Sequence, residues 1–261
     1  MRALKIAATG MSAQQLRVEV ISNNLANMNT TGYNPRRAEF SDLHYQQMSR
    51  AGSINAADGT VLPTGVQLGL GVRAASVTVN VSQGSLSETN GDLDFAIEGP
   101  GYFEVTLPSG RAAYTRDGSL KRSGDGLIVT SDGHAVVPEI VIPADARSIS
   151  VNAEGEVFAY FNDRVEAELL GQFSLAGFSN EKGLEAIGGN LFLETAASGS
   201  ALVGSPGENG LGTLRHGYLE DSSVDAVREV TELIEAQRGY ELNAKVITAA
   251  DQMLAATTQV R

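Results

Sequence analysis

Apolar side chains recur at a spacing of seven residues near both ends of the chain. Near the start, two parallel rows are formed by Leu4, Met11, Val18 and Leu25 and by Ala7, Gln14, Ile21 and Met28. Near the end, a similar row is formed by Leu233, Tyr240, Ile247 and Leu254, with Val230 and Ala244 on the same face. Because one helix cannot bury its own apolar row, each row needs a partner surface. The pattern predicts helices over residues 3–28 and 222–258 that pair as a coiled-coil-like stalk.

Between these rows, the chain consists of short alternating or apolar runs separated by turn residues. The runs that predict strands are residues 76–81, 93–97, 102–107, 113–115, 127–130, 135–137, 149–151, 157–160 and 169–173. Three Asp-Gly pairs, at 117–118, 125–126 and 132–133, predict hairpin turns because both residue types accept a positive φ. The Gly-rich stretch 199–212 is expected to form a loop. We expect one all-β domain of short antiparallel strands.

The fold class predicted from these patterns is α+β, with four segments along the chain. They are the N-terminal helix of the stalk (1–33), an extended β linker or ribbon (34–75), the central all-β domain (76–218) and the C-terminal helix of the stalk (219–261). Gly32 tolerates a left-handed backbone and Pro35 cannot continue a helix, so the first helix is expected to end before Gly32. Ser222 and Ser223 are candidate N-caps of the second helix.

Composition narrows the classes of function. The chain of 261 residues has 19 basic and 31 acidic side chains and a net charge of −12, which argues against a nucleic-acid partner. Residues 1–33 carry three basic side chains and one acidic one, whereas residues 219–261 carry four basic and eight acidic ones. The two ends are therefore weakly complementary in charge. The absence of cysteine excludes disulfides, thiolate nucleophiles and cysteine zinc sites.

The candidate chemical motifs are weak. His44, His134 and His216 lie far apart in the sequence, so no metal site is predicted. Residues 69–74 fit the loose dinucleotide pattern G-x-G-x-x-A, but a strand pattern follows instead of a helix, and no cofactor is expected. Asp92 and Asp94 would share one face of a strand. A paired-carboxylate hydrolase could use them, but an exposed strand face is the expectation.

The first residues, 1–8, resemble the start of a secretory signal. Polar residues interrupt the apolar run at Thr9, Gly10 and Ser12, and the seven-residue pattern continues through the region where cleavage would occur. We therefore expect no cleaved signal peptide. No apolar run approaches the roughly 18 residues needed to span a bilayer.

Five segments resemble the family of flagellar rod and hook proteins. They are residues 22–33 (SNNLANMNTTGY), 97–103 (IEGPGYF), 114–118 (YTRDG), 235–245 (EAQRGYELNAK) and 250–254 (ADQML). The motif positions at the two ends are Asn23, Asn24, Asn27, Gly32, Gln237 and Arg238. Within this family, the length of the chain and residues 62–73 are most similar to the distal rod members. Gly239 stands where the family more often has alanine.

The resemblance implies a structural subunit of the bacterial flagellar basal-body distal rod. Such a subunit would polymerise helically into a hollow, rigid drive shaft that transmits torque from the motor to the hook. The implied partners are further copies of the chain, proximal rod proteins, the hook protein, periplasmic and outer-membrane ring proteins and the flagellar export apparatus. The implied location is the periplasmic part of the basal body, reached by type III export. No enzymatic activity, cofactor, nucleic acid or small-molecule substrate is expected.

We expect the apolar rows to form the assembly interface. The candidate residues are Leu4, Met11, Val18, Ile21, Leu25 and Met28 in the first helix and Val230, Leu233, Tyr240, Ala244, Ile247 and Leu254 in the second. A second hypothesis is that residues 40–73 wedge against adjacent subunits and keep the shaft straight. Two alternatives remain open: another axial protein, either a proximal rod or a hook subunit, and a periplasmic carbohydrate-active enzyme that uses Asp92 or Asp94.

Overall fold

The computed structural model describes residues 2–50, 64–162, 164 and 166–259. The chain divides into two compact units. The first unit, which we call the helical unit, contains Met1–Leu25, Arg36–Thr78 and Ala226–Arg261. The second, which we call the β unit, contains Ala26–Pro35 and Val79–Asp225. Each unit is therefore assembled from segments that are distant in the sequence.

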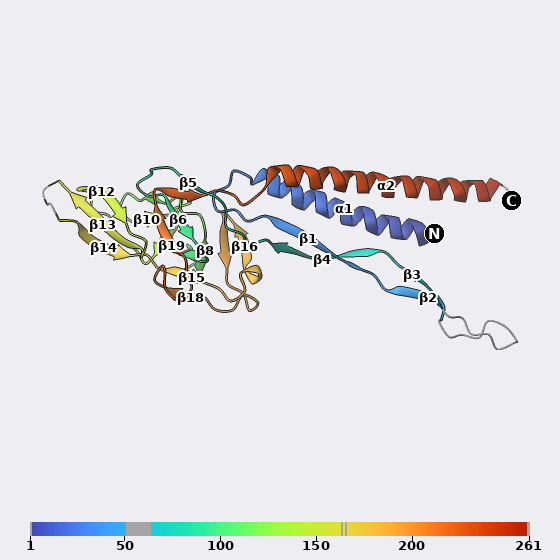
Figure 1. Ribbon diagram of the computed structural model, residues 1–261, viewed down its shortest axis with the longest axis horizontal. Coiled ribbons are helices and arrows are strands. Elements are labelled where there is room, and N and C mark those ends of the chain that lie inside the picture. Colours follow the sequence, from blue (N-terminus) through green and yellow to red (C-terminus); the bar gives the residue numbers. More distant parts are fainter. Residues whose placement is uncertain (1, 51–63, 163, 165, 260–261) are drawn as a thin grey trace. The chain divides into compact units, whose positions relative to one another are not determined.

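Two helices, α1 (Arg2–Ala26) and α2 (Ala226–Gln259), dominate the helical unit. They lie side by side and run in opposite directions, so that the two chain termini lie toward the same end of the pair (Figure 1). Both helices were predicted from the seven-residue pattern, and both are confirmed. Neither has a stretch that is long and apolar enough to cross a membrane, within the residues that the structure describes.

The junctions of both helices differ from the prediction. Helix α1 ends at Ala26 and not at Met28, because the chain turns where the Asn27 carbonyl accepts a hydrogen bond from the Thr30 amide at 3.1 Å. Met28 therefore lies outside the helix, with 42% of its surface exposed. Helix α2 begins at Ala226, and the Ser223 hydroxyl bonds Asn34 Oδ1 at 3.2 Å. Ser223 thus joins the segment that precedes α2 to the segment that follows α1.

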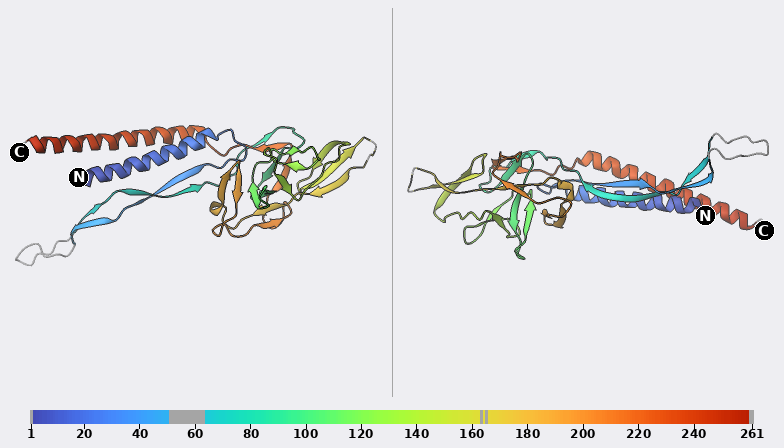
Figure 2. Two further views of the ribbon diagram at one scale, coloured as in Figure 1. Left: turned by 180° about the vertical axis from the view of Figure 1, so that it is seen from behind. Right: turned by 90° about the horizontal axis from the view of Figure 1, so that it is seen from below.

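The segment expected as a linker forms a two-stranded ribbon, most of which belongs to the helical unit. Its strands are β1 (Arg36–Asp42), β2 (Tyr45–Ser49), β3 (Val66–Gly69) and β4 (Val72–Val79). Strand β1 pairs with β4, and β2 pairs antiparallel with β3 (Figure 2). The Gly-rich run 69–74 therefore lies in β3, in β4 and in the turn between them, as the absence of a helical pattern indicated.

The β unit contains sixteen short strands and one turn of 3-10 helix among the described residues. The strands are β5 (Leu86–Glu88), β6 (Phe95–Glu98), β7 (Tyr102–Thr106), β8 (Ala112–Thr115), β9 (Lys121–Arg122), β10 (Ile128–Val129), β11 (Ala135–Val137), β12 (Ala146–Val151), β13 (Glu156–Phe161), β14 (Glu168–Gln172), β15 (Leu175–Gly177), β16 (Glu185–Gly188), β17 (Leu191–Leu193), β18 (Leu202–Gly204), β19 (Thr213–His216) and β20 (Tyr218–Glu220), and the 3-10 turn is η1 (Glu181–Gly183). The antiparallel, all-β character of this unit was predicted and is confirmed.

Strand β7 is the centre of the largest sheet. The sheet order is β16-β17-β8-β7-β11-β10-β9, and β15 joins β7 to β18. Side chains alternate between the two faces of a strand, so Phe103 and Val105 enter the main core while Tyr102 enters a smaller aromatic core on the other face. Smaller sheets, β12-β13-β14, β6-β19 and β5-β20, complete the unit.

Two of the three predicted Asp-Gly hairpins are confirmed. The pairs at 125–126 and 132–133 join β9 to β10 and β10 to β11, and Gly126 and Gly133 both have φ of +86°. The third prediction is wrong, because β8 pairs with β7 and β17 and not with β9. Gly118 instead lets the backbone approach the Phe95 carbonyl so closely that a side chain would not fit. The expected loop 199–212 also contains a strand, β18.

Candidate assembly interface

The contact seam between α1 and α2 is built from small and polar residues. A Cβ atom on Gly10 would lie 3.0 Å from the Asn243 side-chain amide, and one on Gly239 would lie 3.2 Å from Gln14 Cδ. Each helix therefore offers a glycine to an amide side chain of the other. These two contacts fix an antiparallel register, in which residue numbers rise along α1 as they fall along α2.

Charged contacts continue this seam. Arg17 Nη2 lies 3.3 Å from Glu232 Oε2 and 3.7 Å from Glu235 Oε2. The fully packed apolar side chains of the two helices are mostly alanines: Ala7, Ala13, Ile21, Ala236 and Ala250. Small residues let two helices approach closely, but they remove little apolar surface from water. The seam thus sets geometry more than it supplies burial energy.

The predicted assembly rows lie beside this seam. In α1, Ile21 is buried, while Leu4, Met11, Val18 and Leu25 are half-buried. In α2, Leu233, Ala244 and Ile247 are half-buried, and Val230, Tyr240 and Leu254 are 42%, 43% and 42% exposed. The structure therefore brings the two rows alongside each other but leaves much of their apolar surface uncovered.

The two rows meet at a groove of about 480 Å³. Val18 of α1 and Tyr240 of α2 form its apolar walls. Its polar lining is formed by Gln15, Glu19, Gln237 and Glu241. The family motif position Gln237 thus belongs to this groove, and Asn23 and Arg238 are also exposed at the surface of the helices.

Asn24 joins three elements of the helical unit. Its side chain is only 1% exposed. Nδ2 donates to the Arg36 carbonyl at 2.8 Å and to Glu229 Oε2 at 3.1 Å, and Oδ1 accepts from the Arg36 amide at 2.9 Å. An amide can donate and accept at once, so this side chain holds the start of β1 to both helices.

The ribbon packs on α1. The Val72 amide donates to Thr9 Oγ1 at 3.3 Å, and Gly71 lies so close to Thr9 that a side chain at Gly71 would overlap it. A hollow of about 280 Å³ between α1 and β4 is lined by Ala8, Thr9, Ser12, Ala13, Val72, Arg73 and Ala74. One side of α1 therefore faces the ribbon and another faces α2. Val18 lies at the edge of the side that faces α2, where it lines the groove with Tyr240.

In the β unit, the Asn-rich motif continues as a strap, residues 26–35. The Gly32 amide donates to the Glu220 carbonyl at 2.8 Å, and Asn190 Nδ2 donates to the Thr31 carbonyl at 2.9 Å. Gly32 has φ of +64°, and a Cβ there would lie 3.0 Å from the Arg116 carbonyl. Glycine is thus required at this motif position for two separate reasons. Asn27 closes the first turn of the strap by accepting the Thr30 hydroxyl at 3.1 Å.

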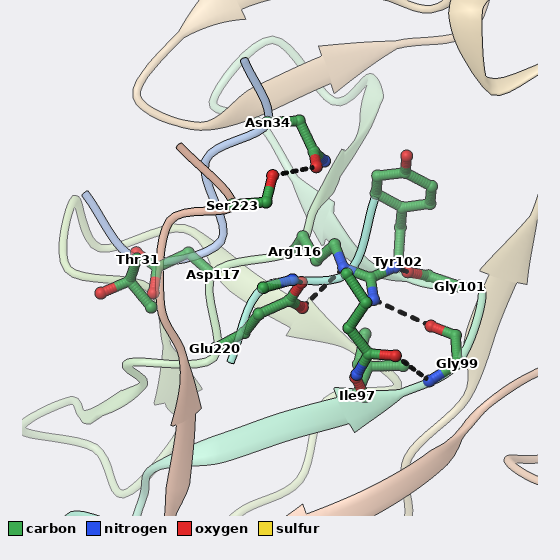
Figure 3. Close-up of polar contacts among 12 residues, drawn as sticks. Thr31, Asn34, Ile97, Gly99, Gly101, Tyr102, Arg116, Asp117, Glu220 and Ser223 are labelled. Atoms are coloured by element: carbon green, nitrogen blue, oxygen red, sulfur yellow. Dashed lines mark hydrogen bonds and ion pairs between the residues drawn. The ribbon is translucent and has the colours of Figure 1, made fainter. Parts of the chain in front are cut away.

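A buried ion pair lies under the strap (Figure 3). Arg116 Nε donates to Glu220 Oε2 at 2.6 Å. The other guanidinium nitrogens donate to the Gly101 and Gly99 carbonyls at 3.2 and 2.8 Å. Glu220 Oε1 accepts from the Gly84 amide at 2.9 Å. Sequence reasoning missed this network; its only sign was that Arg116 belongs to the segment 114–118 that resembles the family.

Asp94 and His216, which the sequence analysis considered for catalysis or metal binding, make contacts within the β unit. Asp92 and Asp94 do not share a strand face, since Asp92 lies in a turn and Asp94 Oδ2 accepts the Thr89 hydroxyl at 2.6 Å. His216 stacks on Phe95 with ring centroids 5.4 Å apart. Within the described part of the chain, no cluster of three or more His, Cys, Asp or Glu side chains could hold a metal ion.

Two buried tyrosines, Tyr102 and Tyr114, have a raised pKa. Burial, followed by the carboxylates of Glu104 and Glu194, raises the pKa of Tyr114 to about 12. Burial also raises the pKa of Tyr102 above its usual range, and the Glu181 carboxylate, which accepts the Tyr102 hydroxyl at 3.1 Å, adds to this effect. Both tyrosines stay neutral and serve as core residues.

Comparison with known proteins assigns the class of protein. Three family descriptions match: "Flagella basal body rod protein" at residues 4–34, "Flagellar hook protein FlgE/F/G D1 domain" at residues 96–159 and "Flagellar basal body rod FlgEFG protein C-terminal" at residues 215–260. The two terminal matches contain both motif segments, and the central match lies in the β unit. The fold and these matches together define a structural subunit of the flagellar rod and hook class.

Individual relatives narrow this class. The flagellar basal-body rod protein FlgG of Caulobacter vibrioides is 54% identical over 261 residues, which is all of both chains. The FlgG protein of Agrobacterium fabrum is 48% identical over 97% of this chain and 97% of its own length. The FlgG protein of Borreliella burgdorferi is 46% identical over 97% of this chain and 96% of its own length. The chain belongs to the FlgG family of flagellar basal-body rod proteins. It is a structural subunit of the distal rod and not an enzyme.

Proposed function

We propose that this chain polymerises helically into a hollow, rigid shaft that transmits torque from the flagellar motor to the hook. The observation that carries the proposal is the uncovered apolar surface along α1 and α2. Tyr240 and Leu254 are 43% and 42% exposed, and Met11 and Val18 are half-buried. Contact with neighbouring subunits would remove this surface from water, at a gain of about 25 cal/mol per Å².

The antiparallel helix pair is proposed to act as a coiled-coil-like stalk that is completed by neighbours. The glycine–amide contacts Gly10–Asn243 and Gln14–Gly239 set its register but bury little apolar surface. Two such helices are marginal alone, because ordering each residue costs roughly 1–2 kcal/mol of conformational entropy. The pooled burial of many subunits in a polymer would offset that cost.

The proposed partners follow from a place in the rod. They are further copies of the chain, proximal rod proteins, the hook protein, periplasmic and outer-membrane ring proteins and the export apparatus. The proposed location is the periplasmic part of the basal body, reached without a cleaved signal peptide.

The ribbon is proposed to keep the shaft straight. Its strands β2 and β3 expose Tyr45, Met48 and Val66 by 59%, 64% and 55%. Isolated two-stranded hairpins are marginally stable in water, so a neighbouring subunit would stabilise this end of the ribbon. Residues 51–63, which belong to the same proposed wedge, lie outside the described residues.

Charge placed in the apolar rows tests polymerisation. Leu25→Asp and Ile247→Asp should each abolish rod assembly, because a carboxylate would be trapped in a subunit contact without a partner. The β unit should stay folded in both variants, as measured by thermal unfolding. Thr248→Asp, at the exposed residue next to Ile247, is the matched control and should assemble. Normal rods from Leu25→Asp and Ile247→Asp would contradict the proposal.

A further inference from the structure

We propose that the groove between α1 and α2 receives the first three turns of α1 from a second copy of the chain. This inference rests on the proposed polymerisation and names the surfaces that meet in it. The groove is defined by Gln15, Val18, Glu19, Gln237, Tyr240 and Glu241. Its occupant would be residues 2–11 of a neighbouring subunit.

The chemistry of the groove selects a basic, apolar helix. Its walls, Val18 and Tyr240, are apolar, and Tyr240 is 43% exposed. Its lining contains two carboxylates, Glu19 and Glu241, and two amides, but no basic side chain. Within the described residues, Glu241 makes no ion pair, while the Glu19 carboxylate accepts a hydrogen bond from Gln15 at 3.1 Å. An incoming lysine or arginine would therefore neutralise charge that the subunit leaves uncompensated.

The start of α1 has the complementary pattern. Residues 1–18 contain three basic side chains and no acidic one. Arg17 is already engaged by Glu232 and Glu235. Arg2 and Lys5 are exposed, and neither makes an ion pair within the described part of the chain. Leu4 and Met11, half-buried and seven residues apart, supply the anchor spacing of a helix that docks into a groove.

The subunit cannot fill the groove with its own α1 terminus. The contacts Gly10–Asn243 and Gln14–Gly239 place the start of α1 beyond the groove along α2. With a rise of 1.5 Å per residue, this register leaves Leu4 about 14 Å from Tyr240 along the helix axis. The charge and apolar complementarity between these two surfaces is therefore available only between copies.

Cysteine pairs test this contact directly, because the native chain contains no cysteine. The full-length variant Leu4→Cys/Tyr240→Cys, assembled into rods and mildly oxidised, should give a ladder of covalent oligomers on a non-reducing gel. A disulfide within one chain is excluded, since it needs Cα atoms within about 7 Å. The control pair Gln14→Cys/Gly239→Cys should close within one chain and run as a monomer. A ladder from the control pair but not from the first pair would overturn the proposal.

Charge exchange provides an independent readout. Lys5→Glu and Glu241→Lys should each raise the critical concentration for assembly about tenfold or more, because like charges across an interface cost several kcal/mol. The double variant Lys5→Glu/Glu241→Lys should restore assembly to within about threefold of the wild type, since the two charges meet again with their signs exchanged. Failure of the double variant to recover, or normal assembly of both single variants, would overturn the groove contact.

The outcomes separate this contact from the proposed function. Rods that form normally in Lys5→Glu and Glu241→Lys but not in Ile247→Asp would mean that the chain polymerises through other surfaces. Cross-links from Tyr240→Cys to the ribbon of a neighbour, for example to Met48→Cys, in place of Leu4→Cys would assign the groove to a different occupant and overturn the inference. Loss of assembly in the wild type itself would contradict polymerisation, and the groove contact with it.

Discussion

Arg116 and Glu220 form an ion pair at 2.6 Å whose side chains are only 5% and 3% exposed. The pair lies where three parts of the β unit meet: the strap 26–35, the loop before β7 and the end of β20. The other oxygens of Glu220 also have partners. Oε1 accepts from the Gly84 amide, and the main-chain carbonyl accepts from the Gly32 amide. The ion pair therefore fixes Glu220, and the main-chain carbonyl of Glu220 holds the strap through the Gly32 amide.

Removing one charge of this pair should be costly. Glu220→Gln keeps the shape of the side chain but leaves the Arg116 guanidinium buried without its counter-ion, so we expect a loss of about 3–5 kcal/mol of unfolding free energy. The control is Glu98→Gln, which breaks the Arg215–Glu98 pair of the same 2.6 Å length, with side chains 48% and 47% exposed. An exposed pair is worth about 0–1 kcal/mol. Equal losses in urea unfolding would contradict the assignment.

Gly32→Ala should destabilise the β unit more than the same change at an open glycine. At Gly32, two obstacles act together: the φ of +64°, and the Arg116 carbonyl, which would lie 3.0 Å from the new methyl group. The conformation alone costs an L-residue about 1–2 kcal/mol, and the backbone contact adds to that. Gly110→Ala, with φ of +77° and no atom within 4 Å, isolates the first cost. Matching melting temperatures for the two variants would show that the strap contact carries no energy.

The β unit should lose stability in alkaline solution. The pKa of Tyr114 is raised from 10.0 to about 12 when folded. Between these values the unfolded chain has released the proton and the folded chain still holds it, so stability is intact below pH 10 and falls as the pH rises toward 12. Tyr102, whose pKa is raised in the same direction, adds to this loss. Urea midpoints across this range should fall less steeply in Tyr114→Phe and Tyr102→Phe, and unchanged slopes would contradict the assignment.

The helices were predictable from sequence, but their register was not. The seven-residue rows define α1 and α2 because any packed helix needs such a face. The register depends on Gly10 and Gly239, which by pattern alone indicate only weak points in a helix. The Arg116–Glu220 pair spans 104 residues, and no local pattern links residues so far apart. Met28 was placed on the helical row because the pattern continues past Ala26, where the hydrogen bonds of Asn27 end the helix.

Gly239→Ala should stabilise the helical unit. Alanine gains about 0.8–1 kcal/mol over glycine in a helix interior, and the new methyl group would meet Gln14 Cδ at 3.2 Å, the flexible end of a side chain that can move aside. Gly10→Ala makes the same change on the other helix, where we expect no gain in stability. Its methyl group would meet the Asn243 amide at 3.0 Å, and that amide is held by a 3.0 Å hydrogen bond to the Gly239 carbonyl.

Only Gly239→Ala should therefore stabilise the helical unit. We expect the melting of the helical circular dichroism signal to shift upward in Gly239→Ala and to stay level or shift downward in Gly10→Ala. Equal upward shifts would mean that helix propensity alone decides both positions and that the glycine–amide contacts do not constrain the register.

Shortening the ribbon should make the rod curve. Deleting residues 41–62 removes β2 and the end of β1, and with them the exposed Tyr45 and Met48 that we expect to contact a neighbouring subunit. Without this wedge, adjacent subunits could slide past each other, so isolated rods should bend in electron micrographs while subunit stability in the β unit stays unchanged. A triple change of Tyr45, Met48 and Val66 to serine keeps the ribbon length and removes only its apolar contacts. Curved rods from the deletion and straight rods from the triple variant would assign the effect to ribbon length, whereas straight rods from both would refute the wedge.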